Sequence, residues 1–171
     1  PVLHFTIKPR TSEPDIHVYV CHFKSKAPTK VFNEPWFKAD KPTYAKHAGA
    51  LGAALSTIRR TAEATALRFL LTERMKGNDT PVIVLGDNND GQHSNTANIL
   101  TEQPQYLVGD SIGGGDAALY TAQTLQEYRN TRDVYYTHIH QDMMESLDHI
   151  LVSQEFYDNS RKRVWLFDGM V

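Results

Sequence analysis

The stretch VIVLGDNND, residues 82–90, joins an apolar run to Gly86 and then to four consecutive Asp or Asn residues. A short run that is apolar on both faces predicts a buried central strand. Gly, Asn and Asp favour turns, so the polar tail is interpreted either as an ordinary turn or as a group of ligands. In the second interpretation Asp87 and Asn89 converge on one side of the chain, where oxygen ligands suit Mg2+ or Mn2+. An EF-hand calcium loop is excluded, because its twelfth position would be Asn98 rather than Glu.

The composition is that of a single globular domain spanning residues 1–171, with 40% hydrophobic and 22% charged residues. A net charge of -2 provides no overall basic field for nucleic acid, which would need a local patch or a bound metal. The single cysteine, Cys21, excludes an internal disulfide and leaves the compartment undetermined. No apolar run approaches the roughly 20 residues that span a bilayer.

The N-terminal half predicts two strands and one long helix. Residues 3–7 and 16–23 alternate in polarity and are expected to form an antiparallel pair. Residues 24–43 contain prolines and predict a long loop. Residues 44–76 predict a helix that Gly77 and Asn78 end. Its apolar residues recur every three or four positions, as in a stripe that faces a core: Leu51, Leu55, Ile58, Ala62, Ala66 and Phe69.

The C-terminal half predicts further helices and strands. Residues 94–102 favour a short helix, residues 112–116 a turn, and residues 116–130 a second helix with Asp116 as its N-cap. Three strands are expected at residues 134–139, 147–153 and 162–167. Strands outnumber helices, and two helices would cover one sheet face, so the sequence predicts an α/β layered domain.

The segment after the second predicted strand carries groups that could bind phosphate. His22 could act as an acid or base, Lys24 as a point charge and Ser25 as a hydroxyl donor. The alternative is a strand-end histidine followed by a solvated basic loop.

An acidic residue interrupts the strand predicted near the C-terminus. Asp148 and His149 are neighbours, so they should point to opposite faces of that strand. Asp148 is interpreted either as a structural hydrogen-bond acceptor or as a catalytic group.

Two other polar clusters are interpreted without catalysis. His138 and His140 would share one strand face and could hold zinc, but no third ligand is evident nearby. Arg59, Arg60 and Glu63 predict a solvated, ion-paired helix surface.

The order of these motifs resembles the endonuclease/exonuclease/phosphatase family, in its deoxyribonuclease and sphingomyelinase-like branch. The motifs are H-x-K-S at residues 22–25, the long helix, GDNND at residues 86–90 and SLDHILVS at residues 146–153. The resemblance implies part of a four-layer α/β/β/α sandwich. It also implies a hydrolase, a metal-dependent nuclease or phosphodiesterase in which Mg2+ or Mn2+ helps water to attack a phosphate ester.

The same resemblance assigns roles by motif. The catalytic residues would be His22, Asp87, Asn89 and Asp148. Asp87 and Asn89 would also bind the metal, and Lys24 and Ser25 would bind the substrate. The expected partner is a phosphate ester, with nucleic acid favoured over lipid or inositol phosphate.

The sequence departs from the family's pattern at both ends. The family's early metal-binding glutamate and its final Ser-Asp-His segment have no counterpart here. We therefore expect a chain that is truncated at both ends, holds the middle-to-late part of the catalytic domain, and has little activity alone. The alternative is a non-catalytic binding or scaffold domain derived from the same family.

Overall fold

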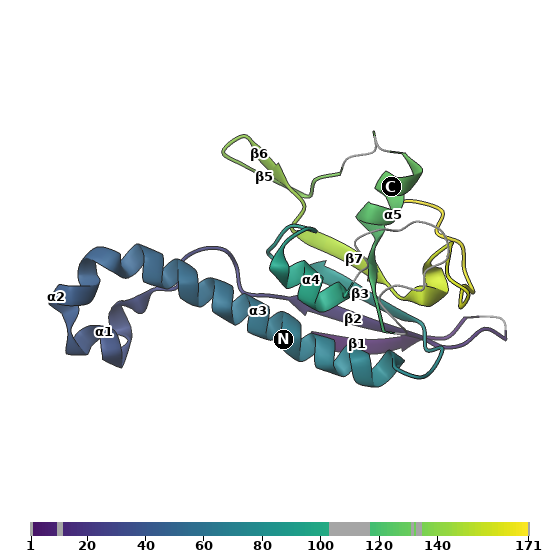
Figure 1. Cartoon of the computed structure of the whole chain (residues 1–171), viewed down its shortest axis with the longest axis horizontal. Coiled ribbons are helices and arrows are strands. Elements are labelled where there is room, and N and C mark those ends of the chain that lie inside the picture. Colours follow the sequence, from purple (N-terminus) through teal and green to yellow (C-terminus); the bar gives the residue numbers. More distant parts are fainter. Residues whose placement is uncertain (1, 10–11, 103–116, 131, 133–134, 171) are drawn as a thin grey trace.

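A computed structural model describes residues 2–9, 12–102, 117–130, 132 and 135–170. Its main feature is a five-stranded sheet in the order β1-β2-β3-β7-β4, beside a separate two-stranded hairpin, β5-β6 (Figure 1). The strands are β1 (Val2–Ile7), β2 (Ile16–His22), β3 (Val82–Asp87), β4 (Tyr120–Thr121), β5 (His138–His140), β6 (Met143–Glu145) and β7 (Asp148–Val152). The central pair β2 and β3 is parallel, and the other pairs are antiparallel.

Short helices occupy the segment that the sequence analysis assigned to a long loop. The helical elements are η1 (Val31–Asn33), α1 (Pro35–Ala39), α2 (Lys41–Tyr44), η2 (Ala45–His47), α3 (Ala48–Met75), α4 (Asn95–Thr101), α5 (Ala122–Arg129) and η3 (Gln154–Phe156). Pro35 and Pro42 lie in the first turns of α1 and α2, where a missing N–H costs nothing, so these prolines start helices instead of breaking them.

The helix expected at residues 94–102 is confirmed as α4, whereas the helix expected at residues 116–130 is shorter, since Tyr120–Thr121 forms β4 and α5 spans Ala122–Arg129. Ser94 caps α4 by accepting a hydrogen bond from the Ala97 N–H, and Thr121 caps α5 in the same way from Thr124. The proposed cap, Asp116, lies outside the described residues. None of the helices in the described ranges is long and apolar enough to cross a membrane.

The core lies between one face of the sheet and the helices α3 and α4 (Figure 1). The sheet contributes Tyr19, Cys21, Val82, Val84 and Leu151, and the helices contribute Ala64, Leu67, Leu71, Met75 and Leu100. These residues are 0–5% exposed, which places a dry layer between sheet and helices. The α/β class, with two helices on one sheet face, is therefore confirmed.

The expected apolar stripe of the long helix is not its buried face. Ile58 and Phe69 are 62% and 70% exposed, whereas Ser56, Arg60 and Leu67 are buried. The polar residues on the buried face have partners in the protein: Ser56 Oγ donates to the Ala27 carbonyl, and Arg60 is ion-paired. Because these tertiary partners offset the cost of burying polar groups, hydrophobic periodicity alone indicates the wrong face.

The strand expected at residues 162–167 is wrong. Val164 and Trp165 both donate their N–H groups to the Glu155 carbonyl, at 2.8 and 3.0 Å, in place of a neighbouring strand. Trp165 stacks on Phe156 with their ring centroids 4.8 Å apart. The segment is therefore not a strand, and apolar contacts attach it to the rest of the protein.

Candidate active site

Three of the predicted catalytic residues lie in one row across neighbouring strands. His22 ends β2 and is in register with Asp87 at the end of β3, which is in register with Asp148 at the start of β7. Register partners on adjacent strands point to the same side of a sheet, so the three side chains share one face. His22 and Asp148 are exposed and Asp87 is half-buried, with His22 Nε2 3.6 Å from Asp87 Oδ2. The row faces away from α3 and α4, because Cys21 and His149, the adjacent residues in the chain, are buried on the other face.

Gly86 allows the ends of β2 and β3 to come this close. Its φ is +143°, and a Cβ at this position would lie 1.9 Å from the Cys21 carbonyl oxygen. No side chain fits there, so the Gly-Asp sequence fixes the position of Asp87 through the backbone before it.

The polar tail of the strand is a turn that also presents Asp87. Asp87 Oδ1 accepts the Asn89 N–H at 2.8 Å, and Asn89 adopts a φ of +52°. The Asn89 side chain is 8% exposed, and its Nδ2 donates to the Phe23 carbonyl at 3.0 Å. Asn89 thus locks the loop after β2 to the turn after β3. Its predicted role as metal ligand or catalytic amide stays a prediction.

The next residue of the turn, Asp90, is held from the long helix. Arg60 Nε lies 3.2 Å from Asp90 Oδ2, and Lys26 Nζ lies 4.0 Å from Asp90 Oδ1. Burial pushes the pKa of Asp90 up, but hydrogen bonds from Thr96 and Arg60 outweigh it and hold that pKa below its ordinary value. The interpretation of Arg60 as a solvated residue is wrong: it is 5% exposed, while Arg59 stays on the surface.

His149 supports the same turn from the opposite sheet face. Its Nε2 lies 2.7 Å from the Asp90 carbonyl oxygen, and the residue is 5% exposed. Burial lowers the pKa of His149, more than its backbone hydrogen bonds to Asp90 and Ser146 raise it. The expectation that Asp148 and His149 point to opposite faces is confirmed. The supporting roles of Arg60 and His149 had no signal in the sequence, because their partner Asp90 is 30 and 59 residues away.

The predicted substrate-binding residues are engaged with their own loop. Lys24 Nζ donates to Ser25 O, Ser25 Oγ and Ala27 O at 3.0–3.1 Å. The Lys24 N–H donates to Glu63 Oε2 at 2.6 Å. Substrate binding by Lys24 and Ser25 would have to compete with these contacts, and it stays a prediction.

A cavity of about 610 Å³ adjoins the row at Asp148. Leu85 and Ile150 line it from the sheet, and Tyr135 and Tyr136 add aromatic surface. A substrate held at the row therefore has a largely apolar space beside it for a larger substituent.

The row has two carboxylates that could bind a hard cation, but the described residues form no larger group of metal ligands there. In the described ranges no group of three or more His, Cys, Asp or Glu residues could hold a metal ion. Mg2+, however, is commonly bound by one or two carboxylates together with water and substrate phosphate. Asp87 and Asp148 provide such a pair. His138 and His140 are exposed on the hairpin, 6.1 Å apart between ring centroids, and belong to no such group there.

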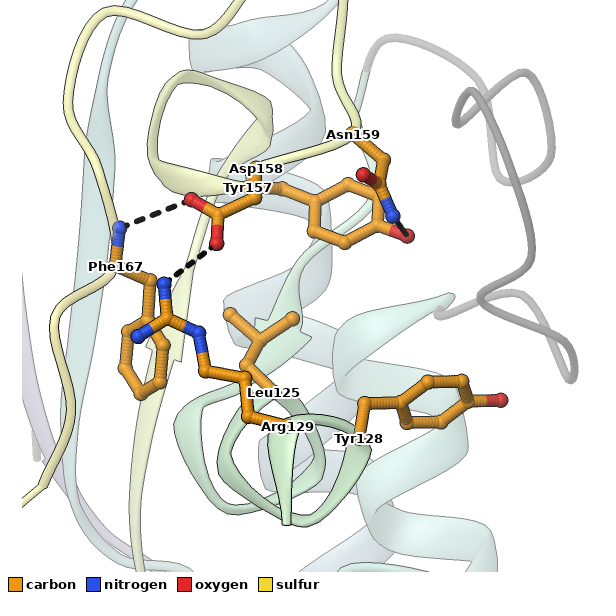
Figure 2. A pocket seen from close by; sticks show the side chains of 7 residues that line it. All are labelled: Leu125, Tyr128, Arg129, Tyr157, Asp158, Asn159 and Phe167. Atoms are coloured by element: carbon orange, nitrogen blue, oxygen red, sulfur yellow. Dashed lines mark hydrogen bonds and ion pairs between the residues drawn. The ribbon is translucent and has the colours of Figure 1, made fainter.

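A second pocket, of about 250 Å³, lies between α5 and the C-terminal segment (Figure 2). Arg129 Nη2 lies 2.7 Å from Asp158 Oδ2, and its guanidinium lies 5.3 Å from the centre of the Phe167 ring. Asp158 Oδ1 also accepts the Phe167 N–H at 3.2 Å. Because these groups bind one another, their contacts attach the C-terminal segment to α5.

Comparison with known proteins finds a distant likeness among solved structures only. No protein-family model and no curated protein matches the sequence. Among solved structures, the chain is similar to the human Nocturnin catalytic domain with bound sulfate anion, with a TM-score of 0.49 and 15% identity. The match covers 91% of this chain and 42% of that chain. At this level of similarity, the assignment of residues depends on the geometry of the chain itself.

Proposed function

We propose that the row of His22, Asp87 and Asp148 is part of a site that hydrolyses phosphate esters with Mg2+ or Mn2+. The observation that carries the proposal is the register that aligns an imidazole and two carboxylates on one sheet face, beside a cavity. The motif resemblance to the endonuclease/exonuclease/phosphatase family supports the same chemistry.

The two carboxylates support a cation at this place. Asp87 and Asp148 are cross-strand partners, and like charges directly opposite destabilise a sheet. Among the described residues, no lysine or arginine forms an ion pair with either carboxylate, and the His22 imidazole lies 3.6 Å from Asp87. A bound divalent cation would relieve this repulsion.

Each residue of the row has a role in the proposed reaction. Asp87 and Asp148 would hold the metal, which would supply Lewis-acid stabilisation of the phosphoryl oxygens. His22, exposed at the end of β2, would hold or transfer a proton at the scissile phosphate. Asp87 Oδ1 is fixed by the Asn89 N–H, which keeps the carboxylate oriented for that work.

The test is hydrolysis of bis(p-nitrophenyl) phosphate by the chain with Mg2+ or Mn2+. We expect slow, metal-dependent turnover that falls at least about a hundredfold further in Asp87→Asn and in His22→Ala. Glu73→Gln, an exposed acid on α3, is the matched control and should leave the rate unchanged. Turnover that persists in Asp87→Asn would overturn the assignment.

The alternative is a non-catalytic binding domain, and one observation favours it. The Asn89 amide, a predicted catalytic group, is buried and bonded to Phe23. Calorimetric titration with Mg2+ separates the two. Metal binding that needs Asp87, without turnover on any phosphate ester, would favour the binding domain.

The substrate beyond the phosphate ester remains a prediction. Arg60 is buried against Asp90, so it is not presented to the phosphate backbone of a nucleic acid. Tyr135 and Tyr136, which line the cavity, would favour a nucleic-acid substrate, because aromatic rings can stack on bases.

A further inference from the structure

Residues 30–47 form a helical arm that projects from the N-terminal end of α3, beyond the sheet (Figure 1). The arm consists of η1, α1, α2 and η2. It lies apart from the core between the sheet and α3, so its surface is not needed to build that core.

An aromatic cluster forms the inside of the arm and reaches its surface. Phe37 is 1% exposed, and both Phe32 and Trp36 pack edge-on against it, at centroid distances of 5.3 and 5.8 Å. Trp36 also packs edge-on against Tyr44 at 5.4 Å. Phe32 remains 59% exposed and Trp36 37% exposed. Phe32 and Trp36 are therefore both packed against Phe37 and both partly exposed to solvent.

The arm is also basic within an acidic chain. Four exposed lysines, Lys30, Lys38, Lys41 and Lys46, stand against two acids, Glu34 and Asp40. Four positive and two negative charges give the arm +2, whereas the whole chain has -2, so the remainder has -4. Charge and apolar side chains are thus concentrated together on the projecting part.

We propose that the arm docks the protein onto an anionic lipid surface. Phe32 and Trp36 would enter the interfacial layer, and the four lysines would contact acidic headgroups. A flat membrane can meet the projecting arm before the acidic body (Figure 1), and salt screens the repulsion of the body beyond about 8–10 Å. Trp36 packs edge-on against Phe37 and Tyr44 and is 37% exposed. This partial exposure suits insertion into a lipid interface better than base stacking, because stacking needs an open ring face. The proposal is independent of any phosphate-ester hydrolysis.

The first experiment is co-sedimentation of the full chain with phosphatidylcholine vesicles, with and without phosphatidylserine. We expect binding only with phosphatidylserine, about tenfold weaker in Trp36→Ala and about fivefold weaker for each lysine neutralised, as in Lys38→Gln and Lys41→Gln. Phe69→Ala is the matched control, because it removes an aromatic side chain that is 70% exposed on the far half of α3. Circular dichroism confirms that each variant is folded.

A second measurement reports the arm directly. The chain has two tryptophans, so Trp165→Phe leaves Trp36 as the only indole. We expect its emission to shift to shorter wavelength with phosphatidylserine vesicles and to shift back when salt is added. No vesicle binding, equal loss in Phe69→Ala, or an unshifted Trp36 emission would each overturn the proposal. So would arm-dependent binding of a single-stranded oligonucleotide that vesicles do not displace.

Discussion

Arg60 in α3 and Asp90 after β3 form an ion pair between the long helix and the turn that presents Asp87, with Arg60 Nε 3.2 Å from Asp90 Oδ2. Their side chains are 6% and 16% exposed, so the pair is shielded from water. Together with the contact of His149 on the Asp90 carbonyl, it holds the turn from two sides.

Arg60→Met should lower the free energy of unfolding by about 3 kcal/mol, because it leaves the largely buried Asp90 carboxylate without its ion-pair partner on α3. Arg59→Met is the matched control, because Arg59 is 68% exposed and pairs with Glu63 on the helix surface. We expect that control to change stability by less than about 0.5 kcal/mol. Urea unfolding followed by circular dichroism measures both. Equal effects would show that the Arg60 pair is no stronger than a surface pair.

Gly86→Ala should destabilise the chain by more than about 3 kcal/mol, because its Cβ would meet the Cys21 backbone and its φ would be strained. Gly91→Ala, in the same loop region, has nothing within 4 Å and should be nearly neutral. The melting temperatures of the two variants, each compared with that of the wild type, measure the difference. A stable Gly86→Ala protein would mean that β2 and β3 can separate at this position.

Asp148→Asn should stabilise the chain in EDTA by about 0.2–1 kcal/mol, because it removes a like-charge pair with Asp87. Added Mg2+ should reverse the order, since only the wild type would then gain from metal binding. Urea unfolding in the two buffers measures the change. The same order of stability in both buffers would count against a cation at the row.

Glu155→Gln should alter how stability depends on pH. Burial raises the pKa of Glu155 above 4.5, although the Ser153 hydroxyl donates to the carboxylate and opposes this shift. The folded state therefore binds this proton more tightly than the unfolded state, so the contribution is fully present below about pH 4.5 and is lost as pH rises through the folded pKa. The variant should gain stability relative to wild type as pH rises from about 4.5 through the folded pKa. A constant difference between the two proteins would contradict the shift.

The sequence predicted the parts of the site that depend on local chemistry. The apolar run before Gly86 correctly predicted a strand, and the Asp-Asn tail predicted both a turn and a carboxylate at the end of that strand. The row itself needed the pairing of β2, β3 and β7, which the motif order indicated only through resemblance.

The errors have a common physical cause. Arg60 and Ser56 are buried because distant groups bind them, whereas the apolar Ile58 and Phe69 stay outside. Residues 162–167 have strand-like composition but no strand to pair with. Burial and pairing depend on contacts across the fold, and local periodicity does not contain them.

The buried thiol of Cys21 can report how often the folded protein opens locally. This thiol is the only one in the chain, is 3% exposed, and donates to Asn88 Oδ1 at 3.4 Å, next to Gly86. Burial raises its pKa to about 12, so the closed protein should scarcely react with a thiol reagent near neutral pH. Each labelling event then requires a local opening that exposes the core between the sheet and the helices α3 and α4. The rate of labelling would therefore measure how often the layer behind the candidate site opens, without any substrate present.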